Sequence, residues 1–302
     1  MKNKTRLFLA VFILPVCAVA VDGGWQERFS IDSSTMSPDG ENAYWSLNPG
    51  RYVVLGNLEP DGSELVVISV LDETETVDGI ETRVIEEREF ENGELVEVSR
   101  NFFARATTTD DIYYYGEDVD YYEDGEVVGH EGEWRAGVND ARPGLYMPAN
   151  PAVGMKFYME IAPGEAMDRA EIFETGASCD TPKGTFEDCL IITESSPLEP
   201  GDESYKRYAK GIGMIHDDGL DLYKYGKRFK SEKYVEFRIT EEQMADTARD
   251  VLYDLHPTGD VREVKVEIRK QRAFYAVETF VDGKQWDVEV RDDGEIFRNK
   301  PD

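Results

Sequence analysis

The chain has 302 residues, of which 40% are hydrophobic, and it carries 63 acidic against 33 basic side chains, for a formal charge of −30. This hydrophobic content suffices for a packed core, so the chain is not a disordered acidic tail. A negative field of this size repels phosphate backbones and anionic membrane surfaces, which argues against nucleic acid as a partner. Cations, basic proteins and neutral small molecules remain as partners, and the charge also keeps an extracellular protein soluble.

The first twenty residues have the three parts of a cleavable signal peptide. A cationic start at residues 1–6 precedes an apolar run over 7–16, and residues 18–20 are small, as a signal peptidase requires. The apolar run is shorter than the ~20 residues that span a bilayer, and no later segment approaches that length. We therefore predict cleavage after Ala20 and a periplasmic or secreted protein without a transmembrane segment. Cys17 raises the alternative of a lipid anchor, although the residue before it fits a lipoprotein signal poorly.

Two cysteines remain after this cleavage, Cys179 and Cys189. An even number of cysteines in an exported chain indicates a disulfide. The bond would close a loop of eleven residues, which stabilises the fold by roughly 3 kcal/mol in the chain-entropy account. Because the turn-forming residues 181–184 lie between the two cysteines, we expect the cysteines to face each other across a hairpin.

Turn-forming Asp-Gly and Asn-Gly pairs punctuate the chain and separate segments in which apolar and polar residues alternate. The alternation over 96–102, a more continuous apolar run over 65–71 and the further segments 80–88 and 111–115 predict strands joined by tight hairpin turns. Few helical patterns interrupt it before residue 232. We therefore predict a mainly β protein, in which residues 21–232 form an antiparallel sheet or a partly closed barrel.

Residues 134–151 differ from their surroundings because they contain three prolines and two glycines. Proline removes a donor from a strand ladder, so an ordered loop is expected here and not an interior strand. Long loops with aromatic, amide and cationic groups are often functional. This loop is therefore predicted to contact a ligand or a protein. The candidate ligand-binding residues are Trp134, Arg142, Tyr146 and Asn150.

The cluster of His130, Glu131 and Glu133 is the most metal-like feature of the sequence. An imidazole and carboxylates serve as metal ligands or as an acid/base set. One histidine does not complete a usual zinc site, so the alternative is a hydrogen bond at a strand edge. The acids of 118–126 lack the spacing of an EF-hand, so calcium or another divalent cation would need an irregular site.

Sequence motifs of known enzymes are missing from the chain. It has no G-x-S-x-G, no H-E-x-x-H and no glycine-rich phosphate loop. The sequence therefore favours a protein without catalytic activity and without a resident cofactor.

Residues 233–302 have the pattern of a separate α+β unit. Thr240 and Gln243 have the spacing of a capping box, and apolar residues follow at helical spacing over 244–255. Three segments of strict alternation come next, up to residue 290. They predict a helix followed by three antiparallel strands.

Residues 240–302 resemble the PepSY-like modules of exported bacterial proteins. The resemblance rests on the capped helix, on the segments 257–261 and 277–284, and on the closing residues 292–296. It implies an inhibitory or regulatory role, and metal binding in some members, with no catalytic residues to carry over.

Residues 45–230 are similar to a group of uncharacterised exported bacterial proteins, which implies an exported β domain of no known activity. The segments that carry this similarity are 115–120, 129–134, 147–151 and 208–213.

The first functional hypothesis is a non-enzymatic binding protein of the bacterial cell envelope, whose ligand is a small molecule or a protein. One alternative is a protein inhibitor or chaperone-like regulator that acts through the PepSY-like domain. The other is a metal-binding protein or a metal-dependent hydrolase. The sequence gives no oligomeric state.

Overall fold

The computed structural model describes residues 24–227 and 235–302. The predicted signal peptide at 1–20, with Cys17, lies outside the described residues. Within the described ranges the chain is mainly β structure, as predicted, and no helix there is both long and apolar enough to cross a membrane.

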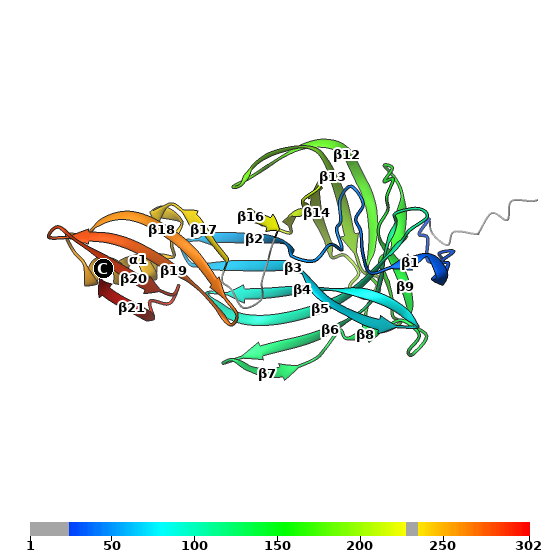
Figure 1. Ribbon diagram of the computed structural model, residues 1–302, viewed down its shortest axis with the longest axis horizontal. Coiled ribbons are helices and arrows are strands. Elements are labelled where there is room, and N and C mark those ends of the chain that lie inside the picture. The colour runs from blue at the N-terminus through cyan, green and yellow to red at the C-terminus, as the bar shows by residue number, and fades with distance from the viewer. Residues whose placement is uncertain (1–23, 228–234) are drawn as a thin grey trace, which may run out of the picture.

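A large antiparallel sheet occupies the first part of the chain (Figure 1). After the 3-10 turn η1 (Ser33–Thr35), its strands are β1 (Met36–Ser37), β2 (Arg51–Glu59), β3 (Gly62–Val77), β4 (Ile80–Glu91), β5 (Glu94–Ala106), β6 (Ile112–Glu123), β7 (Glu126–Gly129), β8 (Trp134–Arg135), β9 (Arg142–Met147), β10 (Lys156–Tyr158), β11 (Glu160–Ile161), β12 (Arg169–Thr181), β13 (Gly184–Ser195), β14 (Glu203–Ala209), β15 (Gly213–Asp217) and β16 (Leu220–Lys227).

Tight two-residue turns join β3 to β4, β4 to β5 and β6 to β7, whereas the longer connection 107–111 joins β5 to β6. Asp78, Asn92 and Asp124 have φ values of 49°, 51° and 52°, and each precedes a glycine that also has positive φ. Two successive residues with positive φ twist a two-residue hairpin in the direction that strand twist favours. The predicted hairpin turns are therefore confirmed at these positions.

The large sheet curls strongly but is not closed into a barrel (Figure 1). Strand β16 returns to pair with β2, and from there the ladder runs through β3, β4, β5 and β6 to β9. On the far side, β12 to β16 pair in sequence order. Between β9 and β12 lie only the short β11, with two residue pairs to β9, and β10, with three to β12. The prediction of an antiparallel sheet is confirmed.

The prediction of a loop over 134–151 is wrong for its central part, because β9 is a strand. Leu145 and Gly144 of β9 pair with Tyr113 and Tyr114 of β6. Pro143 precedes these pairs and opposes β11 instead. Its missing N–H therefore removes no donor from the ladder with β6, which is why a proline is tolerated here.

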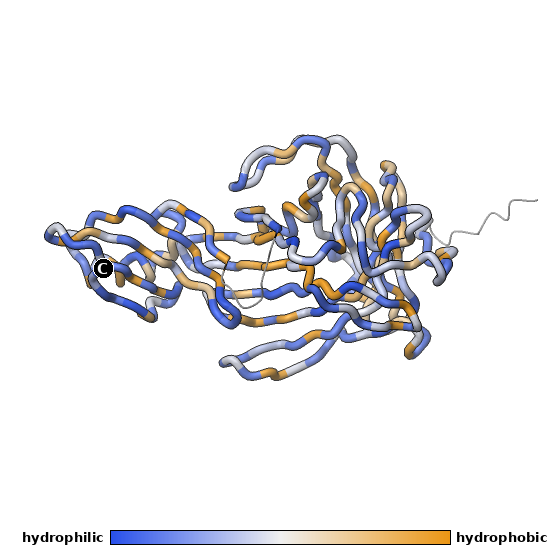
Figure 2. The backbone as a smooth tube through the Cα atoms, viewed as in Figure 1, coloured by the Kyte–Doolittle hydropathy of each residue, from blue (hydrophilic) through white to orange (hydrophobic). Residues whose placement is uncertain are grey.

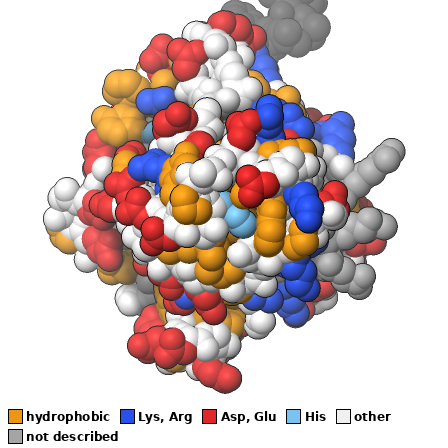
Figure 3. Space-filling model, turned by 90° about the vertical axis from the view of Figure 1, so that its left-hand side faces the viewer, with side chains coloured by type: hydrophobic (Ala, Val, Ile, Leu, Met, Phe, Trp, Pro, Cys, Tyr) orange, Lys and Arg blue, Asp and Glu red, His pale blue; other side chains and the backbone are white. Residues whose placement is uncertain are grey.

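The C-terminal unit has a five-stranded antiparallel sheet in the order β17 to β21 and one α-helix. Its elements are β17 (Val235–Ile239), the 3-10 turn η2 (Glu241–Gln243), α1 (Asp246–Leu255), β18 (Asp260–Arg269), β19 (Arg272–Val281), β20 (Lys284–Val290) and β21 (Ile296–Pro301). The three predicted strands are confirmed, and β17 and β21 flank them. On this end of the molecule acidic and basic side chains are interspersed (Figure 3).

The predicted start of the helix at Thr240 is too early. The Thr240 N–H does donate to Gln243 Oε1 at 3.0 Å, as a capping box requires. The turn that follows is 3-10, and Met244 then adopts an extended conformation with φ of −74° and ψ of 147°. Met244 and Ala245 are fully buried, so their burial interrupts the helix before α1 begins at Asp246.

Two hydrophobic cores lie on opposite faces of β2 and β3. Side chains of a strand alternate between faces, so Leu55 and Val66 enter the first core while Val54 and Leu65 enter the second. The first core fills the inside of the curl. The second lies between the outer face and the C-terminal unit, where it includes Leu252 of α1. Figure 2 shows the apolar residues along these central strands.

Candidate functional site

Carboxyl groups continue the inner face of the large sheet beyond its apolar core. In the ladders of β4, β5 and β6, Glu87 opposes Ser99, Glu89 opposes Glu97, and Glu117 opposes Asn101. Opposite residues on one face of an antiparallel pair are neighbours. These four glutamates therefore lie on the same inner face.

Three more charged side chains reach this region from the other side of the curl. They are Glu194 of β13, Lys206 of β14 and Asp217 of β15. Glu87 interacts electrostatically with Lys206 and Asp217, and also with Glu117 of β6. The curl thus gathers acids from strands that are far apart in the sequence. Glu160 of β11 also belongs here, since the charges of Glu117, Glu194 and Lys206 act on it. We call the five residues Glu87, Glu117, Glu160, Glu194 and Lys206 the inner charged cluster.

One cation lies at the centre of the inner charged cluster. Lys206 Nζ is 2.9 Å from Glu194 Oε2 and 3.3 Å from Asp217 Oδ2. Burial lowers the pKa of Lys206, but the two carboxylates outweigh this effect and hold it well above its ordinary value. The other carboxyl oxygen of Glu194, Oε1, is buried and has no hydrogen-bond partner among the residues of 24–227 and 235–302.

The carboxyl groups of the cluster have raised pKa values because they are withdrawn from water. Burial raises the pKa of Glu87 to about 8 and that of Glu117 to about 7. Burial, and then the neighbouring charge of Glu117, raise the pKa of Glu160 well above its usual range. Burial also raises the pKa of Glu194. At neutral pH the cluster therefore retains protons that the same side chains would lose in water.

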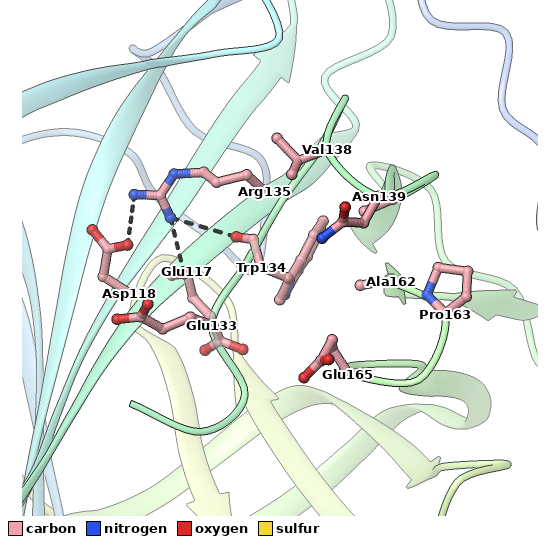
Figure 4. Close-up of a pocket in the computed structure, with 11 residues that line it drawn as sticks. Glu117, Asp118, Glu133, Trp134, Arg135, Val138, Asn139, Ala162, Pro163 and Glu165 are labelled. Carbon is pink, nitrogen blue, oxygen red and sulfur yellow. Dashed lines mark hydrogen bonds and ion pairs between the residues drawn. The ribbon is translucent and has the colours of Figure 1, made fainter. Parts of the chain in front are cut away.

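A cavity of about 200 Å³ opens beside Glu117 at the edge of β6 (Figure 4). We call it the Glu117 pocket. Trp134 of β8, which pairs with Glu117, forms part of its wall, and the turn after β11 forms another part. Its lining residues are Glu117, Asp118, Glu133, Trp134, Arg135, Val138, Asn139, Ala141, Ala162, Pro163 and Glu165.

The one basic residue that lines the Glu117 pocket is already neutralised. Arg135 Nη2 is 2.7 Å from Asp118 Oδ1, and Arg135 Nη1 donates to the Glu117 carbonyl oxygen at 2.9 Å. Its guanidinium also lies 4.1 Å over the ring of Phe102. The carboxyl groups of Glu117, Glu133 and Glu165 therefore leave the pocket with an excess of negative charge.

The indole N–H of Trp134 is a buried donor in the wall of the pocket. Trp134 is only 5% exposed, and among the residues that the structure describes its Nε1 finds no hydrogen-bond acceptor at standard geometry. The indole lies close enough to the Glu117 carboxyl to lower its pKa, against the stronger effect of burial. A buried donor without a full partner is costly, so a ligand that accepts this hydrogen would be favoured.

The four predicted ligand-binding residues do not form one site. Trp134 lines the Glu117 pocket, but Tyr146 is buried in the aromatic core, where its ring centre is 4.7 Å from that of Trp45. Arg142 is exposed, with Nη2 at 3.7 Å from Glu27 Oε2, and Asn150 is exposed outside the pocket. The structure thus does not bring Arg142, Tyr146 and Asn150 to the Glu117 pocket with Trp134, because they lie on or after β9 and outside its lining. Their role in ligand binding stays a prediction.

Sequence reasoning missed Glu117 and the residues of the inner charged cluster. A signal was present, since Ile85, Glu87 and Glu89 share one face of β4 and the first of them is a core residue. Glutamates that continue an apolar face are unexpected on a soluble sheet.

The predicted metal cluster is only partly assembled. His130 Nδ1 is 2.9 Å from the Val119 carbonyl oxygen, 3.1 Å from Asp120 Oδ1 and 3.4 Å from Glu133 Oε1. The hydrogen bond to Val119, and then nearby carboxylates including Glu131, raise the pKa of His130. This matches the alternative of a strand-edge hydrogen bond. No group of three or more metal-ligating side chains was found within 24–227 and 235–302, and metal binding stays a prediction.

The two cysteines lie on the hairpin of β12 and β13 and are buried free thiols in the structure. They do not oppose each other directly, because Cys179 pairs with Phe186 and Cys189 with Ala177. Burial and the adjacent Cys179 thiol raise the pKa of Cys189 to about 12. The hairpin placement agrees with the prediction, and the disulfide itself stays a prediction.

Comparison with known proteins finds no matching family model, no matching curated protein and no matching solved structure. The resemblance of residues 240–302 to PepSY-like modules, and of residues 45–230 to exported β-domain proteins, stays a prediction from sequence patterns.

Proposed function

We propose that this protein is an exported, non-enzymatic binding protein of the bacterial cell envelope. Its ligand would be a small primary amine that also carries a carbonyl or hydroxyl oxygen, bound in the Glu117 pocket. The observation that carries the proposal is the meeting of a desolvated carboxyl, Glu117, and a buried indole donor without a well-formed hydrogen bond, Trp134, in one cavity.

The charge of the pocket favours a cation. Glu117, Glu133 and Glu165 line it, while the guanidinium of Arg135 is held by Asp118. With a pKa of about 7, Glu117 is half protonated near neutral pH. An ammonium group would take the place of that proton and would lower the pKa of Glu117, because an opposite charge favours the ionised carboxyl.

The second requirement is an oxygen acceptor near the ammonium group. The Trp134 N–H, which approaches the Glu117 carboxyl without a hydrogen bond of standard geometry, would donate to this acceptor. A fully unsatisfied buried donor costs about 1–3 kcal/mol, which is the upper bound of the gain. The cavity of about 200 Å³ is smaller than the sites that hold drug-sized ligands. A single amino compound therefore fits better than a polymer segment.

Calorimetric titration with lysine amide tests the proposal, with hexanamide as the matched ligand that keeps the carbon chain and the amide but has no amino group. We expect lysine amide to bind and hexanamide to fail. The Glu117→Gln variant should bind lysine amide more weakly than the wild type by a factor of about ten or more, which corresponds to about 1.4 kcal/mol of binding free energy. Trp134→Phe keeps an aromatic ring but removes the N–H donor, so it should reduce the affinity for lysine amide less than Glu117→Gln does.

The matched control is Glu126→Gln in β7, an exposed glutamate outside the pocket. It removes the same charge and should leave the affinity unchanged. Equal binding of both amides, or equal losses in the Glu117 and Glu126 variants, would contradict the proposal.

Export is tested separately by mass spectrometry of the mature N-terminus. Val21 is the expected first residue. An acylated Cys17 would show a lipid-anchored protein, and an intact N-terminus would contradict export through a cleaved signal.

A further inference from the structure

A second cavity, of about 460 Å³, lies between the large sheet and the C-terminal unit, and its charge is opposite to that of the chain as a whole. We call it the junction pocket. Its charged lining residues are Lys183, Lys224, Arg238, Lys265 and Glu236. Four bases and one acid are unexpected in a protein with 63 acidic and 33 basic residues.

Contacts between the two parts of the molecule hold the junction pocket together. The β12–β13 hairpin arches toward the C-terminal unit (Figure 1), and at its tip Lys183 N–H donates to the Leu222 carbonyl oxygen at 2.9 Å. On β16 the ring of Tyr223 lies 5.0 Å from that of Phe237 on β17. Gln243 Nε2 also donates to Tyr223 Oη, at 3.2 Å. The basic side chains are thus carried on a connected framework.

Two of the four bases have acidic partners. Arg238 contacts Glu263, whose Oε2 is also 2.9 Å from Lys265 Nζ, and Lys265 Nζ is 4.0 Å from Glu236 Oε2. Lys183 and Lys224 form no ion pair with any residue that the structure describes. Counting Glu263 and Glu278, whose charges both act on Lys265, four bases face three acids, and Lys183 and Lys224 supply the basic excess.

The overall negative charge does not cancel this local excess. At physiological ionic strength, charges further away than about 8 Å are largely screened. The groups that line the pocket therefore decide which ion it attracts, and unpaired lysines attract oxyanions.

We propose that the junction pocket binds a polyvalent oxyanion, which contacts Lys183 and Lys224 of the large sheet together with Arg238 of the C-terminal unit. This site is separate from the Glu117 pocket and does not depend on the function proposed for it. Because the ligand contacts both parts of the molecule, it binds the native state and raises the unfolding temperature.

Titration with inorganic pyrophosphate and with citrate, in about 150 mM NaCl to screen distant charges, tests the proposal. We expect one-to-one binding of at least one of them together with a rise in the unfolding temperature. The double variant that carries both Lys183→Gln and Lys224→Gln should bind the oxyanion about tenfold or more weakly than the wild type. Pyrophosphate alone would identify a phosphate ligand, and citrate alone a polycarboxylate.

The control carries Lys284→Gln and Lys300→Gln, two exposed lysines of the C-terminal unit outside the pocket. It has the same net charge as the test variant and should bind as the wild type does. A variant with Lys183→Arg and Lys224→Arg keeps the charges and should retain binding even if the glutamine variant unfolds. Absence of binding by the wild type, or an equal loss in the control, overturns the proposal.

Discussion

The inside of the curled sheet has two halves that differ in what they do for the protein. In the aromatic half, the ring of Tyr146 lies 4.7 Å from the rings of both Trp45 and Phe103. In the other half, the inner charged cluster withdraws Glu194 and Lys206 from water. The aromatic half stabilises the fold, whereas burial of charge costs free energy that pairing recovers only in part.

Buried carboxyl groups are not required for the stability of a β-sheet. Their presence next to a cavity, with raised pKa values, is typical of a functional site. The difference between the two halves therefore supports the assignment of binding to the side that carries Glu117, and it predicts that substitutions in the two halves have different consequences.

The largest effect is expected in the aromatic half. Phe103→Ala removes a ring that is 1% exposed, and it should lower the free energy of unfolding by about 3–5 kcal/mol because a cavity remains. Phe173→Ala, at a position that is 53% exposed, is the matched control and should cost less than about 1 kcal/mol. Urea denaturation measures both. Similar losses would mean that the aromatic half does not carry the stability.

A smaller effect is expected at the centre of the charged half. Lys206→Met removes the cation between Glu194 and Asp217, and it should destabilise the fold by about 3 kcal/mol at neutral pH because buried carboxylates lose their partner. The loss should shrink in acid, where protonation removes the charge. Lys210→Met breaks an exposed pair with Asp188 and should leave the free energy of unfolding nearly unchanged, because solvent screens an exposed ion pair. Equal costs for the two lysines would contradict the account.

The smallest effect is a change in the pH dependence of stability. Burial raises the pKa of Glu87 from 4.5 to about 8, so the folded state holds this proton more tightly than the unfolded state. The stability from this group is complete below the unfolded pKa and is lost as pH rises through the folded pKa. Glu87→Gln should therefore flatten the fall in unfolding free energy between about pH 5 and pH 9.

Glu91→Gln is the control for this prediction, because Glu91 is exposed at the end of the same strand. Its pH profile should follow that of the wild type. A Glu87→Gln profile that also follows the wild type would show that Glu87 is solvated.

Local features of the fold could be read from the sequence, and the site could not. Asp78 and Asn92 with their glycines specify hairpin turns because positive φ is a short-range requirement. The return of β16 to β2, which pairs Asp221 with Gly56, has no local signal. Glu87 lies between the charged residues Glu86 and Arg88, so alternation alone cannot tell the inner face of β4 from the outer one there.

The most direct test of the central claim is a carbon NMR titration of the Glu117 carboxyl, with and without lysine amide, assigned by comparison with Glu117→Gln. The account predicts a pKa of about 7 in the free protein, since burial raises it, and a fall in that pKa when the amine is bound. A pKa near the ordinary 4.5 of a glutamate that does not change on addition of the amine would contradict it.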